Sequence, residues 1–97
     1  MASNEPWVKD PSSLLDYAFD WSDWLGPDDT ISTMDTIITP NTNVPLLVVE
    51  QQSVFEGVHT IWLSGGRKST KYNVKSKITT VDGREEERTR TLKIMSK

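Results

Sequence analysis

The stretch VHTIWLSGGRKSTKYNVKSKITTVDGREEERTRTLKIM, residues 58–95, decides the fold. Its pattern predicts three consecutive β-strands, at residues 58–64, 72–80 and 89–95. The first is rich in β-branched and aromatic residues, and a Gly-Gly pair ends it. The second alternates apolar or small residues with polar ones, the period of two that is typical of a strand with one solvated face.

A turn between the second and third of these strands predicts a β-hairpin. Asp82-Gly83 is a favoured turn pair, and Leu92 and Ile94 share one face of the returning strand. The charged run at residues 84–88 is expected to form a tip outside the core. Because its strands are close in sequence, the hairpin closes at a low entropic cost and is expected to set the register of its sheet.

The remaining strands are shorter or less regular. Residues 15–21 alternate aromatic with small or acidic residues, which favours a half-buried strand, although their neighbours are also compatible with a helix. Residues 30–39 are β-branched, but their apolar positions change phase, which predicts a strand with a bulge or one at a sheet edge. Residues 46–49 predict a short apolar strand that turns polar.

About seven short strands at the 8–12-residue spacing of such folds predict an all-β protein, an antiparallel Ig-like or fibronectin-III-like β-sandwich. We expect residues 1–9 to be a flexible N-terminal arm and residues 10–97 to be a single Ig-like domain. Tyr72 is either the tyrosine of a tyrosine corner, whose hydroxyl bonds the upstream backbone, or an ordinary half-buried strand tyrosine. The predicted core consists of Tyr17, Phe19, Trp21, Ile61, Leu63, Tyr72, Val74, Ile78, Leu92 and Ile94.

Composition excludes several classes of function. The 97 residues include no cysteine and one histidine, His59, so disulfides, thiol catalysis and zinc sites built on several such ligands are excluded. No nucleophile motif accompanies His59, so we expect a solvated strand histidine and a protein that is not an enzyme. The acids of residues 20–29 could surround a calcium ion, but surface acid clusters are usually solvated. We therefore predict no catalytic residue, no metal site and no cofactor.

Neither a membrane nor an export signal is indicated. No apolar run approaches the ~18–20 residues of a membrane span, and residues 1–20 lack the basic and apolar regions of a signal peptide. We expect the chain to be made in the cytoplasm and to have no membrane partner.

Charge is distributed unevenly along the chain. The net charge of −3 makes nucleic acid an unexpected partner. Residues 1–50 carry nine acids and one lysine, a net charge of −8, whereas residues 51–97 carry ten bases and five acids, a net charge of +5. Either the two halves pair within one sandwich, or the protomer is electrically polar and packs against copies of itself or an oppositely charged lattice.

Two features suit contacts between proteins. Trp24 follows the end of an alternating strand, and it is either an exposed interface anchor or a lid over one end of the sandwich. The charged run at residues 84–90 is either a solvated, salt-bridged tip or a self-complementary docking finger. The candidate interface residues combine these features with two acids of the turn after Trp24: Trp24, Arg84, Glu86, Arg88, Arg90, Asp28 and Asp29.

A series of segments along nearly the whole chain carries a family resemblance. The segments are DYAFDWSDWL (residues 16–25), DTI (29–31), IWLSGG (61–66), YNV (72–74), ITT (78–80) and GREEERT (83–89). In this order they resemble a family of small structural proteins encoded among the head and neck genes of tailed bacteriophages, which are taken to be Ig-like virion components.

The resemblance implies a non-enzymatic protein that is made in the host bacterial cytoplasm and assembled into the virion. The function we expect is capsid decoration, in which a cement protein binds the major capsid protein on the capsid surface. One alternative is a ring component of the neck or tail, with neighbouring virion subunits and further copies of the chain as partners. Another is a stand-alone carbohydrate- or protein-binding module that uses Trp24, Trp62 and the nearby acids.

Overall fold

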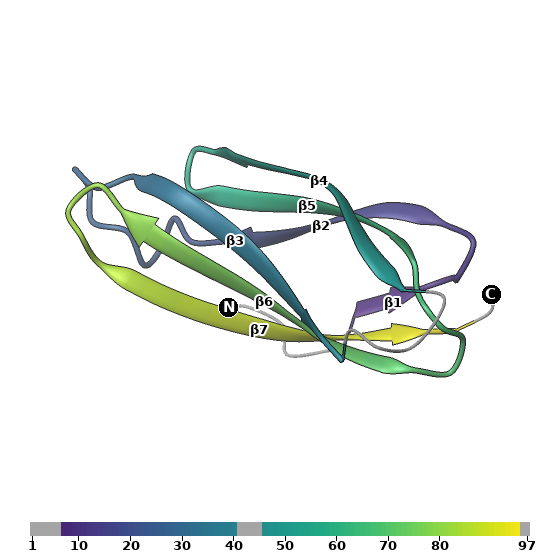
Figure 1. Ribbon diagram of the computed structural model, residues 1–97. Helices are drawn as coiled ribbons and strands as arrows, with labels where there is room; N and C mark the ends of the chain where they lie inside the picture. The colour runs from purple at the N-terminus through teal and green to yellow at the C-terminus, as the bar shows by residue number, and fades with distance from the viewer. Residues whose placement is uncertain (1–6, 41–45, 96–97) are drawn as a thin grey trace.

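Seven strands form two facing sheets in the computed structural model, which describes residues 7–40 and 46–95 (Figure 1). The first sheet has the order β1-β7-β6-β3 and the second the order β2-β5-β4. No helix occurs among the described residues, so none of them forms a membrane-spanning helix. The strands are β1 (Trp7–Lys9), β2 (Leu14–Asp20), β3 (Ile31–Thr39), β4 (Leu47–Phe55), β5 (Val58–Gly65), β6 (Lys71–Thr80) and β7 (Glu85–Ile94).

The topology confirms the predicted sandwich. Every strand pairing is antiparallel except that of β1 with β7. The order of the strands matches that of an immunoglobulin constant-type sandwich, except that the first strand pairs with the last. The hairpin β6–β7 lies in the middle of the larger sheet, and its role in setting the register stays a prediction.

The core between the sheets contains nine of the ten predicted residues. These nine are buried, and Leu47 at the start of β4 joins them. Tyr17 is half-buried, because β2 is an edge strand and the ring stacks on Trp7, with ring centroids 4.6 Å apart. Its hydroxyl donates a hydrogen bond to the carbonyl oxygen of Val8.

Tyr72 forms a tyrosine corner. The residue is 1% exposed, and its hydroxyl oxygen accepts a hydrogen bond of 2.9 Å from the backbone N–H of Arg67. Arg67 lies five residues upstream, in the connection between β5 and β6. The ring therefore fills the core while the hydroxyl fixes the path of this connection.

The predicted irregular strand and short strand have a clear structural basis. β3 is an edge strand, and its pairing with β6 shifts register between Ile31 and Thr33, which explains the change of phase. β4 extends well past residue 49, because a bulge between Val49 and Gln51 keeps the polar residues that follow in the ladder. Its hairpin with β5 turns at Glu56-Gly57, whose φ angles of 49° and 80° are those of a type I′ turn.

Two expectations from the sequence are corrected by the strand boundaries. The charged run was expected to form a tip, but β7 begins at Glu85, so most of the run belongs to the ladder with β6. The arm was expected to extend through residue 9, but Trp7–Lys9 form β1 and pair with β7. The Lys9 ammonium is buried and donates hydrogen bonds to the carbonyl oxygens of Asp10 and Gly65, which ties β1 to the end of β5. The rest of the predicted arm, residues 1–6, lies outside the described residues.

Candidate interaction surfaces

Three arginines on the core-facing side of β7 and its preceding turn each lie over a tryptophan. We call these residues the arginine clamp. The ring-centroid distances are 4.0 Å for Arg84 over Trp24, 4.2 Å for Arg88 over Trp21 and 5.0 Å for Arg90 over Trp7. Each such contact stabilises by about 0.5–2 kcal/mol, depending on how far it is removed from water.

The clamp also bonds the loop after β2. The Arg84 guanidinium donates a hydrogen bond of 2.9 Å to the carbonyl oxygen of Trp24, and that of Arg88 donates one of 2.7 Å to the carbonyl oxygen of Asp20. Arg88 also lies 3.6 Å from the carboxylate of Asp23. For these arginines, therefore, the oppositely charged halves of the chain do pair within the sandwich.

Asp29 anchors the turn that follows β6. Its Oδ1 accepts hydrogen bonds from the backbone N–H groups of Thr30 and Asp82, at 3.0 Å and 3.1 Å. Its Oδ2 is buried and lies 3.7 Å from Nε of Arg84. Burial raises the pKa of Asp29, but hydrogen bonds from the Thr80 hydroxyl and from these two backbone groups, together with Arg84, outweigh burial and lower the pKa below its ordinary value. The carboxylate therefore stays ionised and holds the turn in place.

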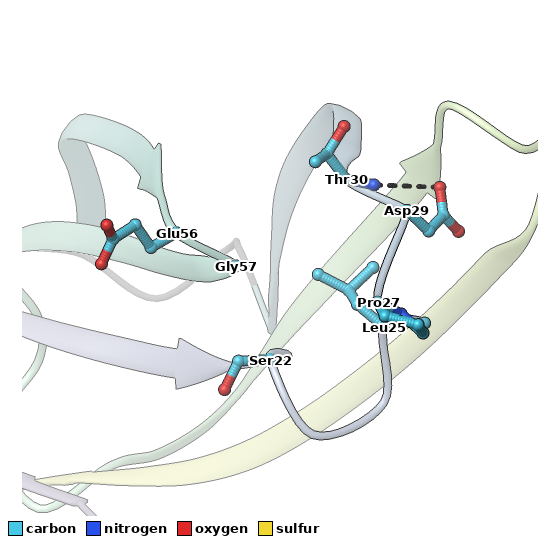
Figure 2. A pocket seen from close by; sticks show the side chains of 8 residues that line it. Ser22, Leu25, Pro27, Asp29, Thr30, Glu56 and Gly57 are labelled. Carbon is cyan, nitrogen blue, oxygen red and sulfur yellow. Dashed lines mark hydrogen bonds between the residues drawn. The ribbon is translucent and has the colours of Figure 1, made fainter.

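A hollow of about 290 Å³ lies between the loop after β2 and the β4–β5 turn (Figure 2). Leu25 and Pro27 line its middle, and the carboxylates of Glu56 and Asp29 lie apart on opposite sides of it. Within residues 7–40 and 46–95, no group of three His, Asp or Glu side chains lies close enough to hold a metal ion. The hollow thus has an apolar wall without converging polar groups.

Trp24 covers this end of the sandwich. Its ring packs edge-to-face on Trp21, with centroids 5.5 Å apart, and the Arg84 guanidinium lies over the same ring. It is only partly exposed. These contacts are those of a lid, and a partner's contact with the exposed part of the ring stays a prediction.

His59 is fully buried, which corrects the expectation of a solvated histidine. Its Nε2 donates to Oε1 of Gln52 at 2.9 Å, so Nδ1 is the acceptor from the Ser76 hydroxyl at 2.8 Å. That hydroxyl oxygen in turn accepts a hydrogen bond from the Trp21 indole. Burial lowers the pKa of His59, and Asp35 offsets this only in part. The neutral imidazole therefore links both sheets in a closed polar network inside the core.

The outer face of the β2-β5-β4 sheet is apolar and acidic, and we call it the Trp62 face. Trp62 lies at its centre, with Asp16 directly opposite on β2, and at one end Phe55 is 73% exposed. The three strands contain no lysine or arginine. The face consists of Leu14, Asp16, Ala18 and Asp20 on β2, Val58, Thr60, Trp62 and Ser64 on β5, and Val48, Glu50, Gln51, Ser53 and Phe55 on β4.

The two ends of the long axis carry opposite charge. The acidic end comprises the loop after β2, the β4–β5 turn and the β6–β7 turn with the start of β7. The basic end comprises the β5–β6 connection with the adjoining ends of β6 and β7. The acidic end carries Asp23, Asp28, Asp29, Glu56, Asp82, Glu85 and Glu86 against Arg84 and Arg88. Besides the buried Lys9, the basic end carries Arg67, Lys68, Lys71 and Lys93 against Asp10.

The structure brings most of the predicted interface residues together, but in contacts within the chain. Trp24, Arg84 and Asp29 form one cluster, and Arg88 and Arg90 continue it along β7. Asp28 and Glu86 are exposed at the acidic end. A partner's contact with these seven residues stays a prediction. Sequence reasoning named Trp62 only in the alternative of a binding module and did not single out the basic end as a surface, although the absence of lysine and arginine from residues 10–66 was a visible signal.

Comparison with known proteins identifies the family. No curated protein matches the chain. The family model described as podophage GP4 fiber-tail adaptor protein gp77 matches residues 9–93, which include β2 to β6 and all of β7 except its last residue. The chain therefore belongs to the family of the podophage GP4 fiber-tail adaptor protein gp77, a family of structural proteins of the bacteriophage virion.

Proposed function

We propose that this protein is an adaptor subunit that joins a fibre to the tail of a podophage virion, and that it acts by binding rather than by catalysis. The observation that carries the proposal is the match of residues 9–93 to a family described as a fibre–tail adaptor. This description supports the neck or tail alternative better than capsid decoration, the function that the sequence favoured.

An adaptor needs at least two separate docking surfaces, and the sandwich offers surfaces of different chemistry. The Trp62 face combines an aromatic centre, exposed Leu14 and Phe55, and acids without any base. Tryptophan is enriched at the energetic centre of interfaces, and an acid-only rim favours a basic partner. The occupant we propose for this face is therefore a basic surface of the fibre or of a neighbouring tail protein.

The outer face of the larger sheet differs in character. Lysines and threonines dominate it along β6 and β7, and Ile37 is its large apolar side chain on β3, at 38% exposed. Lys75 pairs there with Glu87, with 3.8 Å between the charged atoms. This face serves as the internal reference against which substitutions on the Trp62 face are compared.

The experiment removes the protein from the particle. A phage with a stop codon in the gene for this chain should yield filled, heat-stable heads whose tails carry no fibres when viewed by electron microscopy. Supplying the wild-type chain or Ile37→Ser in trans should restore the fibres, whereas a Trp62→Ser/Asp16→Lys chain, checked for a native melting transition, should not. Normal fibres on particles with weakened heads would contradict the adaptor role and favour decoration.

A further inference from the structure

The molecule is long enough for its two charged ends to act independently. Its extents are 42 × 26 × 18 Å, whereas the Debye length at physiological salt is about 8 Å. A partner at one end is therefore hardly influenced by charge at the other. Each end presents its own field, and the chemistry of each can be considered separately.

The acidic end presents a rigid apolar knob. Val81, at the tip of the β6–β7 turn, is 66% exposed, and Asp82 and Glu85 flank it. The turn is held by bonds from Val81 N–H to the Thr30 carbonyl, from Gly83 N–H to the Thr80 carbonyl, and from Asp82 N–H to the Asp29 carboxylate. Because this turn is fixed before any contact forms, little conformational entropy is lost when it docks.

The basic end presents a hollow of matching chemistry. Ser69, Thr70, Lys71, Lys93, Ile94 and Met95 line a cavity of about 280 Å³. Lys71 and Lys93 lie directly opposite each other on neighbouring strands, an arrangement that destabilises an isolated ladder. Within the described part of the chain neither lysine forms an ion pair. The hollow therefore combines an apolar wall with two ammonium groups that lack a counter-charge there.

We propose that the Val81-Asp82 turn of one copy docks into this hollow of a second copy. Val81 packs against Met95, which is 49% exposed, and the carboxylates of Asp82 and Glu85 meet the ammonium groups of Lys71 and Lys93. The contact joins two different surfaces, so repeating it produces a closed ring or an open filament. It uses neither the Trp62 face nor the arginine clamp, and it does not depend on the adaptor role.

The contact is expected to be weak and sensitive to salt. The ends of a body 26 × 18 Å across offer less than the roughly 800 Å² per partner of a standard stable interface. Association should therefore be visible at high protein concentration and low salt. It should fall at about 1 M salt, where the Debye length shrinks to about 3 Å.

Sedimentation velocity of the purified full chain, from micromolar to millimolar concentration, tests the proposal. The wild type should sediment faster as its concentration rises at low salt. Val81→Ser, the knob reversal Asp82→Lys/Glu85→Lys and the hollow reversal Lys71→Glu/Lys93→Glu should each remain monomeric, with native melting transitions. The control substitutions Val48→Ser and Lys77→Glu should associate like the wild type.

Mixing the knob reversal with the hollow reversal is the most discriminating experiment. Each variant repels itself, but a mixture restores opposite charge at both kinds of contact, so the mixture should associate as strongly as the wild type. A wild type that stays monomeric at millimolar concentration and low salt would overturn the proposal. Normal association of Val81→Ser or of Asp82→Lys/Glu85→Lys would also overturn it, as would a mixture that stays monomeric. If only Trp62→Ser abolished association, the contact would belong to the Trp62 face instead.

Discussion

The arginines of the clamp and the lysines of the basic end are both cationic, yet their surroundings differ. Arg84 and Arg88 lie over tryptophan rings and donate hydrogen bonds to backbone carbonyls. Lys71 and Lys93 oppose each other across a ladder without an ion pair in the described chain. A positive charge near an aromatic ring of the same chain therefore serves the fold here, whereas the two opposed lysines have no counter-charge in the described chain.

The largest expected effect separates the tryptophan beneath the clamp from the one on the outer face. Trp21→Ala removes a fully buried ring, the platform of Arg88 and the hydrogen bond to Ser76, so it should lower the free energy of unfolding by about 3–5 kcal/mol. Trp62→Ala, at a partly exposed position on the outer face, should lower it by clearly less. Urea denaturation of both variants checks this, and equal losses would break the distinction between the two tryptophans.

A single arginine of the clamp should show a smaller effect. Arg88→Ala loses the contact with Trp21 and the hydrogen bond to Asp20, which together stabilise by about 1–2 kcal/mol. Arg67→Ala at the exposed basic end should change the stability by no more than about 0.5 kcal/mol. Thermal and urea unfolding of both variants measure the difference, and a neutral Arg88→Ala would show that the clamp arginine is no more structural than a surface base.

The buried histidine predicts a pH dependence that no surface charge explains. Because burial lowers the pKa of His59, the unfolded chain binds its proton more tightly, and stability should fall as pH decreases from the ordinary value of about 6.5 towards the lowered one. Asp29 has a lowered carboxyl pKa, so its contribution is lost only at more acidic pH. Urea midpoints at pH 7.5 and pH 5.5 test this, with His59→Gln as the control. If the urea midpoint of His59→Gln fell as much between pH 7.5 and pH 5.5 as that of the wild type, the pH dependence would not come from His59.

The smallest expected effect is a gain in stability. Lys93→Glu places opposite charges across the ladder at the Lys71 pair, and such cross-strand pairs differ from like-charged ones by about 0.2–1 kcal/mol. The variant should therefore unfold at a slightly higher urea concentration than the wild type, while Lys68→Glu, in the adjoining connection, should not. A loss of stability in Lys93→Glu would mean that this ammonium group already serves the fold.

The sequence predicted the sandwich well because period-two patterns report directly on which side chains face the core. Nine of the ten predicted core residues are buried, and Leu92 and Ile94 do share the inner face of β7. The resemblance to phage structural proteins is confirmed at the level of the virion family, although the family supports the tail more than the capsid surface.

The errors came from long-range contacts that local pattern does not contain. The charged run after Gly83 has the composition of a solvated tip, but its arginines contact tryptophans that lie 60 to 83 residues earlier in the chain. The polar partners of His59 come from two other strands: Gln52 from β4, which pairs with β5, and Ser76 from β6, which belongs to the facing sheet. These contacts exist only once the two sheets are packed together. The charge difference between the two halves of the chain was visible, but its division between the two ends of the molecule depends on topology.

Urea denaturation of two triple variants tests most directly whether the clamp arginines stabilise the fold while the bases of the basic end do not. Both variants remove three positive charges. Arg84→Gln/Arg88→Gln/Arg90→Gln should lower the free energy of unfolding by about 2–4 kcal/mol, since three cation–π contacts and their hydrogen bonds are lost. Arg67→Gln/Lys68→Gln/Lys71→Gln should stay within about 0.5 kcal/mol of the wild type. Equal stabilities of the two variants would contradict the account, because the clamp arginines would then be as dispensable to the fold as the exposed bases of the other end.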